Sequence, residues 1–154
     1  MKKFPQVAAI AGSILLATVA LSAHADDGLI RLKSASSVAQ TADKLEAVLK
    51  AKGMTVFTRI NHTKGAESVG LSLRPTEVVV FGNPKIGTLL MNCSPQMAID
   101  LPQKTLIQED EQGQVWLSYN DPQYLAERHD IQGCEKPLKK VAGALNAFAQ
   151  KATQ

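Results

Sequence analysis

The chain has 154 residues and a formal net charge of +3, with 17 Lys and Arg residues against 14 Asp and Glu residues. This length suits one domain that can bury a sizeable core. With so small a charge excess and few, scattered aromatic residues, the composition gives no reason to expect nucleic acid or an anionic membrane surface as a partner.

The first 25 residues have the pattern of a bacterial signal peptide. Lys2 and Lys3 precede an apolar stretch over about residues 7–21, and Ala23-His24-Ala25 is a small-x-small cleavage site. An uncleaved membrane anchor is the alternative, but the stretch is shorter than the roughly 20 residues that span a bilayer. We expect cleavage after Ala25, export to the periplasm, and a mature domain over residues 26–154, of net charge +1 and without a stable membrane anchor.

The first half of the mature chain shows four expected elements and a polar connection. Residues 29–33 alternate and predict a strand. Ser37–Gln40 form a capping box, and the apolar residues that follow at helical spacing predict a helix that ends at Gly53. Beyond that helix, residues 54–60 predict a second strand, the polar residues 61–66 a loop or an irregular connection, and residues 68–73 a third strand.

The second half alternates strands and helices. Residues 77–81 are a continuous apolar run, typical of a central strand buried on both faces. After the turn at Gly82-Asn83-Pro84, apolar residues up to Ile99 predict one broken helix or two short ones. The remaining predictions are a hairpin of residues 105–108 and 115–119, a short helix from Asp121-Pro122 through His129, and a terminal amphipathic helix over residues 138–148.

The predicted order of elements is β-α-β-β-β-α-β-β-α-α. Short connections between consecutive strands favour a mostly antiparallel sheet with the helices packed on one face. We therefore predict a single α+β domain, a two-layer sandwich, rather than a doubly wound nucleotide-binding fold.

Cys93 and Cys134 are the only cysteines in the chain. In the oxidising periplasm such a pair is expected to form a disulfide, whereas a reducing cytosol would leave two free thiols. A nucleophilic cysteine would need a neighbouring base, and no motif supplies one. A disulfide that closes a loop of about 40 residues would stabilise the fold by roughly 4 kcal/mol.

Five segments, taken in order, resemble the bacterial family called "domain of unknown function 302". They are Asn61-His62, residues 81–88 (FGNPKIGT), Asp100-Leu101-Pro102, the hairpin that ends at Tyr119, and residues 125–129 (LAERH). The resemblance covers about residues 29–150 and implies a small α+β fold similar in outline to the TATA-binding-protein type. It implies no settled activity, and the cysteine pair is an addition to the family pattern.

Polar residues next to turns are the candidates for a binding site. His62 follows a predicted strand, and imidazole exchanges protons near neutral pH. Asn83 and Lys85 belong to a turn whose N–H groups could hold an anion, although backbone geometry alone explains its Gly and Pro. Tyr119 is a candidate for the rim of a cleft or for packing in the sheet. His129, late in a short helix, could meet His62.

The sequence supports no metal centre and no common hydrolase. His62 and His129 with Asp100 or Asp130 would make a metal site, but the spacings typical of metal ligands are missing. Nucleophile motifs of the hydrolases are missing too. No cofactor can be identified from the sequence.

Three functions therefore stay open. The leading hypothesis is a periplasmic small-ligand-binding or accessory domain without catalysis, with its site near His62, the 82–85 turn and Tyr119. The first alternative is an enzyme that uses His62 as acid or base, assisted by His129 or Tyr119. The second is a self-associating or partner-binding domain, for example a homodimer.

Overall fold

The computed structural model describes residues 28–154, so the predicted signal peptide lies outside the described residues. The elements are β1 (Leu29–Ser34), α1 (Val38–Ala51), β2 (Thr55–Asn61), α2 (His62–Ser68), β3 (Thr76–Gly82), α3 (Pro84–Cys93), the 3-10 helix η1 (Pro95–Ile99), β4 (Gln103–Glu109), β5 (Val115–Asn120), α4 (Pro122–Arg128) and α5 (Glu135–Thr153). Among these, no helix combines the length and the apolar character needed to cross a membrane.

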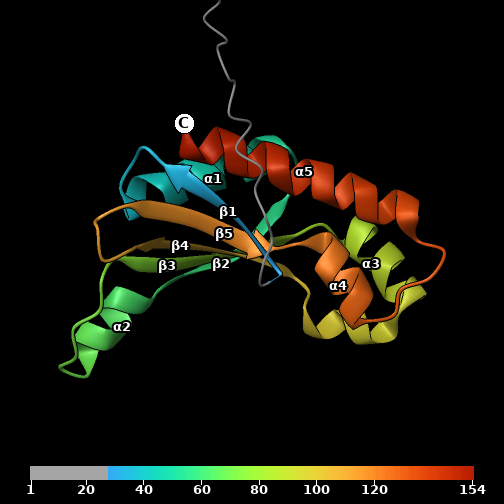
Figure 1. The fold of residues 1–154 in the computed structure, drawn as a ribbon, viewed down its shortest axis with the longest axis horizontal. Coiled ribbons are helices and arrows are strands. Elements are labelled where there is room, and N and C mark those ends of the chain that lie inside the picture. Colours follow the sequence, from blue (N-terminus) through green and yellow to red (C-terminus); the bar gives the residue numbers. More distant parts are fainter. Residues whose placement is uncertain (1–27) are drawn as a thin grey trace, which may run out of the picture.

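The five strands form one sheet in the order β1-β5-β4-β3-β2, and every neighbouring pair is antiparallel. Helices α1 and α5 lie along one face of this sheet (Figure 1). Helices α3 and α4 lie beyond one end of the strands, and α2 projects from the opposite end (Figure 1). The predicted α+β two-layer sandwich is confirmed.

The core lies between the sheet and the two long helices. Alternate residues of the inner strands, such as Val79, Phe81 and Ile107, face the helices and are fully buried. Helix α1 contributes Leu45 and Leu49 at helical spacing, and α5 contributes its own apolar stripe. Burial of these side chains is the main stabilising term of the fold.

Local signals in the sequence are confirmed at several helix ends. Ser37 and Gln40 form the predicted capping box at α1, and Gly53 follows that helix with a φ of 69°. Asp121 caps α4 through the backbone N–H of Gln123. The hairpin β4–β5 and the split of the region after Pro84 into α3 and η1 also agree with the prediction.

The structure differs from the prediction in the region between β2 and β3. The loop expected over residues 61–66 is wrong, because Asn61 accepts a hydrogen bond from the backbone N–H of Lys64 and starts α2. The strand expected over residues 68–73 is also wrong. Its alternating residues Val69, Leu71 and Leu73 are exposed, by 69%, 66% and 44%, and pair with no strand of the described chain.

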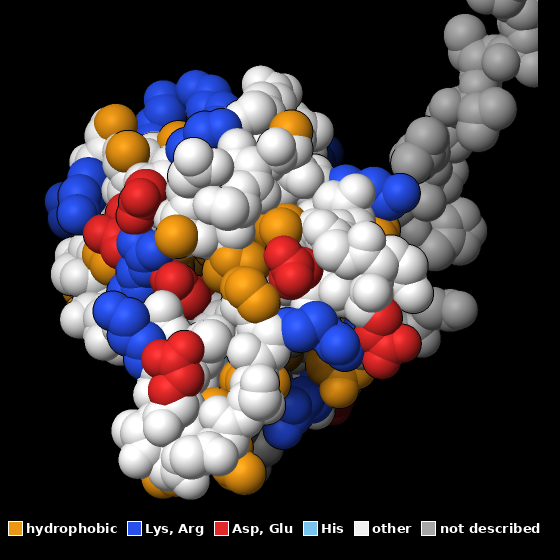
Figure 2. All heavy atoms as spheres, turned by 90° about the vertical axis from the view of Figure 1, so that its left-hand side faces the viewer, with side chains coloured by type: hydrophobic (Ala, Val, Ile, Leu, Met, Phe, Trp, Pro, Cys, Tyr) orange, Lys and Arg blue, Asp and Glu red, His pale blue; other side chains and the backbone are white. Residues whose placement is uncertain are grey.

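Strand β3 also differs from the expectation of burial on both faces. It lies between β2 and β4, but only alternate residues are buried, and Val78 and Val80 are half-buried on the face that α1 and α5 do not cover. Helix α2 with residues 69–75 forms a projecting segment, which we call the arm. In Figure 2 the arm is the lowest part of the molecule, with hydrophobic side chains at its lower edge.

Candidate functional site

An apolar cavity of about 750 Å³ opens where the strands end against α3 and α5. Helix α3 contributes Ile86, Gly87, Leu90 and Met91 to its lining, and α5 contributes residues from Lys140 to Phe148. Met54, the ends of β3 and β4, and Ala98 with the segment after η1 also contribute. This volume lies in the range of pockets that hold small organic ligands.

One wall of the cavity depends on how α3 begins. The Asn83 side chain accepts a hydrogen bond of 3.0 Å from the backbone N–H of Lys85, and Pro84 occupies the first turn. The amphipathic helix that follows turns Leu90 inward, where it is fully buried. The turn at Gly82-Asn83-Pro84 therefore starts α3 and contributes to the lining of the cavity.

A bulge in β2 places an aromatic ring at the cavity. The register of β2 on β3 shifts between Val56 and Thr58, which leaves Phe57 as the extra residue. Phe57 is 54% exposed and lines the cavity, and a Cβ atom on Gly82 would lie only 3.3 Å from its ring. Glycine at position 82 thus allows the ring to lie against the end of β3.

The polar residues of the lining are few. Lys52, Lys85 and Lys140 are exposed, so they lie at the mouth, and the lining contains no Asp or Glu. Gln103 is the only buried polar residue of the lining. Its side-chain amide makes no hydrogen bond with another residue in the described part of the chain, which leaves it available to a ligand or water.

Two cross-links hold the helices that build the cavity. Cys93 at the end of α3 and Cys134 at the start of α5 form the predicted disulfide. Nε2 of His129 lies 2.5 Å from Oδ2 of Asp100, which ties the end of α4 to the residue after η1. The His129 side chain is almost fully buried in this contact, so it acts as a brace of the helical region and does not line the cavity.

His62 lies at the opposite end of the sheet from the cavity. Asn61, the residue before it, pairs with Glu77 at the start of β3, whereas Gly82 at the other end of β3 lines the cavity. At about 3.4 Å a residue, the two ends of that strand are roughly 17–20 Å apart. His62 is exposed, its ring makes no hydrogen bond within residues 28–154, and it does not meet His129.

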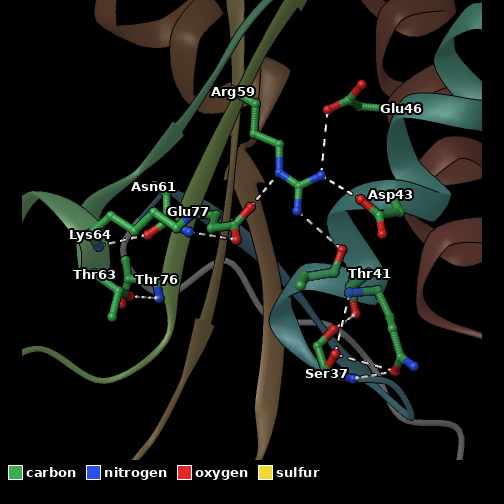
Figure 3. Close-up of polar contacts among 12 residues, drawn as sticks. Ser37, Thr41, Asp43, Glu46, Arg59, Asn61, Thr63, Lys64, Thr76 and Glu77 are labelled. Carbon is green, nitrogen blue, oxygen red and sulfur yellow. Dashed lines mark hydrogen bonds and ion pairs between the residues drawn. The ribbon is translucent and has the colours of Figure 1, made fainter.

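The residues around His62 hold the arm against the sheet (Figure 3). The Asn61 amide donates to the buried Glu77 carboxylate at 3.0 Å, and Arg59 Nε donates to the same carboxylate. The Thr63 hydroxyl accepts a hydrogen bond of 2.9 Å from the backbone N–H of Thr76. These contacts fix α2 to the start of β3.

Tyr119 packs in the core, which is one of the two predicted alternatives. Its side chain is 2% exposed, and its hydroxyl has no hydrogen-bond partner in the described chain. Burial, with a smaller contribution from the Asp121 charge, raises the pKa of Tyr119 to about 12. Since Tyr119 does not line the cavity, the structure brings together only Asn83 and Lys85 of the five candidate residues.

Most of the lining is not evident from the sequence. Within residues 28–154, no group of three His, Cys, Asp or Glu side chains could hold a metal ion. The lining residues make the site an apolar cavity with lysines at its mouth. The spacing of apolar residues on α3 and α5 predicts faces that pack in a core, and part of each face lines the cavity as well. One feature of the sequence could have indicated the cavity. Lysines at positions 52, 85 and 140 lie next to apolar helix faces.

Comparison with known proteins identifies the family. The family described as "Domain of unknown function DUF302" matches residues 30–148. The chain belongs to this family. A crystal structure of an uncharacterised conserved DUF302 protein from Bacillus stearothermophilus is similar in fold, with a TM-score of 0.74 and 17% identity over 82% of this chain and 98% of that chain.

Closer relatives in sequence are longer proteins. The DUF302 chain is 47% identical over 106 residues to proteins named "Fluoride-specific ion channel FluC 1" from Brucella suis biovar 1 (strain 1330) and Brucella abortus biovar 1 (strain 9-941). The match covers 69% of this chain but 42% and 39% of those proteins. This chain thus spans about two fifths of the length of the relatives that it matches.

Proposed function

We propose that this DUF302 domain binds a small, largely apolar ligand in the cavity between α3, α5 and the strand ends, without catalysing a reaction. The observation that carries the proposal is the cavity itself, about 750 Å³ in volume and lined almost wholly by apolar side chains. Pockets of this kind, with a few polar groups at defined positions, are typical of binding sites for small molecules.

The geometry gives less support to catalysis. The residue proposed as acid or base, His62, is exposed on the arm and lies far from the cavity. Fluoride transport is not proposed either, because the relatives that carry that name extend well beyond the part that this chain matches.

A neutral fluorescent probe, N-phenyl-1-naphthylamine, tests the proposal because its emission rises on transfer to apolar surroundings. We expect saturable binding to the wild-type protein. The change Ala144→Trp should reduce binding at least tenfold, because the indole would fill the cavity from α5. Ala147→Trp, on the exposed side of the same helix, is the matched control and should bind as the wild type does. Equal binding by both variants would refute a site in this cavity.

We further propose that the domain acts in the periplasm after export. The signal-like pattern of residues 1–25 and the disulfide between Cys93 and Cys134 support this location, since disulfides persist in oxidising compartments. The expected mature product begins at Asp26.

A second candidate function is self-association through the arm. The exposed side chains Val69, Leu71 and Leu73 favour it, because they present apolar surface that the described chain leaves uncovered. Light scattering across a concentration series should then show a dimer that Leu71→Asp converts to a monomer. A wild-type monomer at every concentration would rule out this candidate.

A further inference from the structure

The cavity separates apolar from charged surface. Its depth is formed by buried aliphatic and aromatic side chains, among them Leu90, Val141, Leu145 and Phe148. Its charged residues, the three lysines, are all exposed at the mouth. A ligand that satisfies both regions has a long apolar part and a polar group at one end.

The charge at the mouth has one sign only. Lys52 ends α1, Lys85 lies in the first turn of α3 and Lys140 lies on α5, so three separate elements contribute a lysine to the lining. Within residues 28–154 none of them has a carboxylate within 4.0 Å, whereas Lys50, nearby on α1, is paired with Glu46 at 3.0 Å. The N-terminal end of α3 adds positive potential at the same place.

We propose that the cavity takes a single-chain amphiphile with an anionic head group, with its alkyl chain between α3 and α5 and its head group among Lys52, Lys85 and Lys140. This inference rests on the proposed function and names the class of ligand for that same site. The proposal rests on charge complementarity, because the lining contains three lysines and no Asp or Glu. A carboxylate and a phosphate monoester share the required chemistry.

Displacement of N-phenyl-1-naphthylamine by ligands of one chain length tests the head group. Decanoate and decyl phosphate should displace the probe at concentrations at least ~5-fold lower than 1-decanol, and decylamine should be the weakest of the four. Whichever anion displaces the probe at the lower concentration identifies the head group. Octanoate should be weaker than decanoate by roughly 15-fold, because the two differ by two methylenes and each buried methylene strengthens binding about fourfold.

Substitution of the lysines tests where the head group lies. Lys85→Gln and Lys140→Gln should each weaken decanoate binding by about 3- to 5-fold and leave 1-decanol binding unchanged. Lys151→Gln makes the same charge change on α5 outside the lining and is the matched control. The Lys52→Gln, Lys85→Gln, Lys140→Gln triple variant should bind decanoate and decanol equally.

The outcomes separate this inference from the proposed function. If the probe binds and Ala144→Trp blocks it, but decanol competes as well as decanoate, the cavity binds ligands and the anionic class is wrong. The anionic class is also wrong if the triple variant still prefers decanoate. If the probe does not bind, or Ala144→Trp leaves its binding unchanged, both the proposed function and this inference fail.

Discussion

The Arg59 guanidinium is surrounded by acceptors from two elements, β3 and α1. It donates to Glu77 on β3, to Asp43 Oδ1 on α1 at 2.5 Å and to the carbonyl of Ala39 at 3.2 Å (Figure 3). The hydrogen bond with Glu77 raises the pKa of Arg59 above its usual value, so the side chain stays charged. The buried Glu77 carboxylate depends on this partner.

We therefore expect Arg59→Ala to lower the free energy of unfolding by about 2–4 kcal/mol, because it leaves a buried carboxylate uncompensated. Chemical denaturation measures the change. Arg74→Ala is the control: its pair with Glu111 is exposed on both sides and should contribute less than about 1 kcal/mol. Similar losses in the two variants would show that burial of Glu77 has no special role.

Tyr119 gives a prediction for alkaline pH. In the folded protein its pKa is about 12, against 10.0 for an ordinary tyrosine, so the folded state keeps the phenolic proton that the unfolded chain releases. Below pH 10 the raised pKa of Tyr119 makes its full contribution to the free energy of unfolding. This contribution, roughly 1–2 kcal/mol, is lost as the pH rises toward 12.

In the Tyr119→Phe variant, the free energy of unfolding should fall less between pH 10 and pH 12 than in the wild type, while other groups titrate as before. At pH 7 the same variant should be equal to the wild type or more stable, since it eliminates a buried hydroxyl that has no partner within residues 28–154. Denaturation curves at pH 7, 10 and 11.5 provide the comparison. A wild type and variant with the same pH dependence would mean that Tyr119 titrates normally.

At the scale of elements, the disulfide joins the two helices that form the cavity walls. Cys93 and Cys134 are 41 residues apart in the sequence, for which chain entropy gives about 4 kcal/mol of stabilisation. The Cys93→Ala, Cys134→Ala double variant should lose this amount in chemical denaturation. It should also bind N-phenyl-1-naphthylamine more weakly, because α3 loses its link to α5. A reduced wild type with an unchanged denaturation midpoint would contradict this role.

Elements with strong local signals are predictable from the sequence. The capping box at Ser37, the glycine after α1 and the Asp121-Pro122 start depend on contacts within a few residues. The arm is not predictable in this way. Helix α2 buries none of its residues, and the alternation of Val69, Leu71 and Leu73 resembles a strand that lacks a partner, with Gly70 at a φ of 74° between them.

The site is less predictable than the fold, because its lining comes from segments far apart in the chain. The sequence places Asn83 and Lys85 in a turn, but it does not show that α5 lies across the cavity from that turn. The bulge that places Phe57 at the cavity depends on the register between β2 and β3. The sequence predicts His62 and Tyr119 beside the turn, but His62 lies at the other end of β3 from the cavity, and Tyr119 is buried in the core and does not line the cavity.

At the scale of the whole molecule, the proposed export and the disulfide give a joint prediction. Protein recovered from the periplasm should have the mass of residues 26–154, about 2 Da below that of the dithiol form. Intact mass spectrometry measures both features at once. A chain that retains residues 1–25, or two thiols that can be alkylated, would contradict the proposed location.

Methyl-resolved NMR during titration with N-phenyl-1-naphthylamine is the most direct test of the cavity as the binding site. Aromatic rings shift the resonances of methyl groups that they contact. We predict shifts at Ile86, Leu90, Val141 and Leu145, which line the cavity, and none at Leu71 and Leu73 on the arm. Shifts confined to the arm, or spread evenly over the molecule, would contradict a ligand site between α3 and α5.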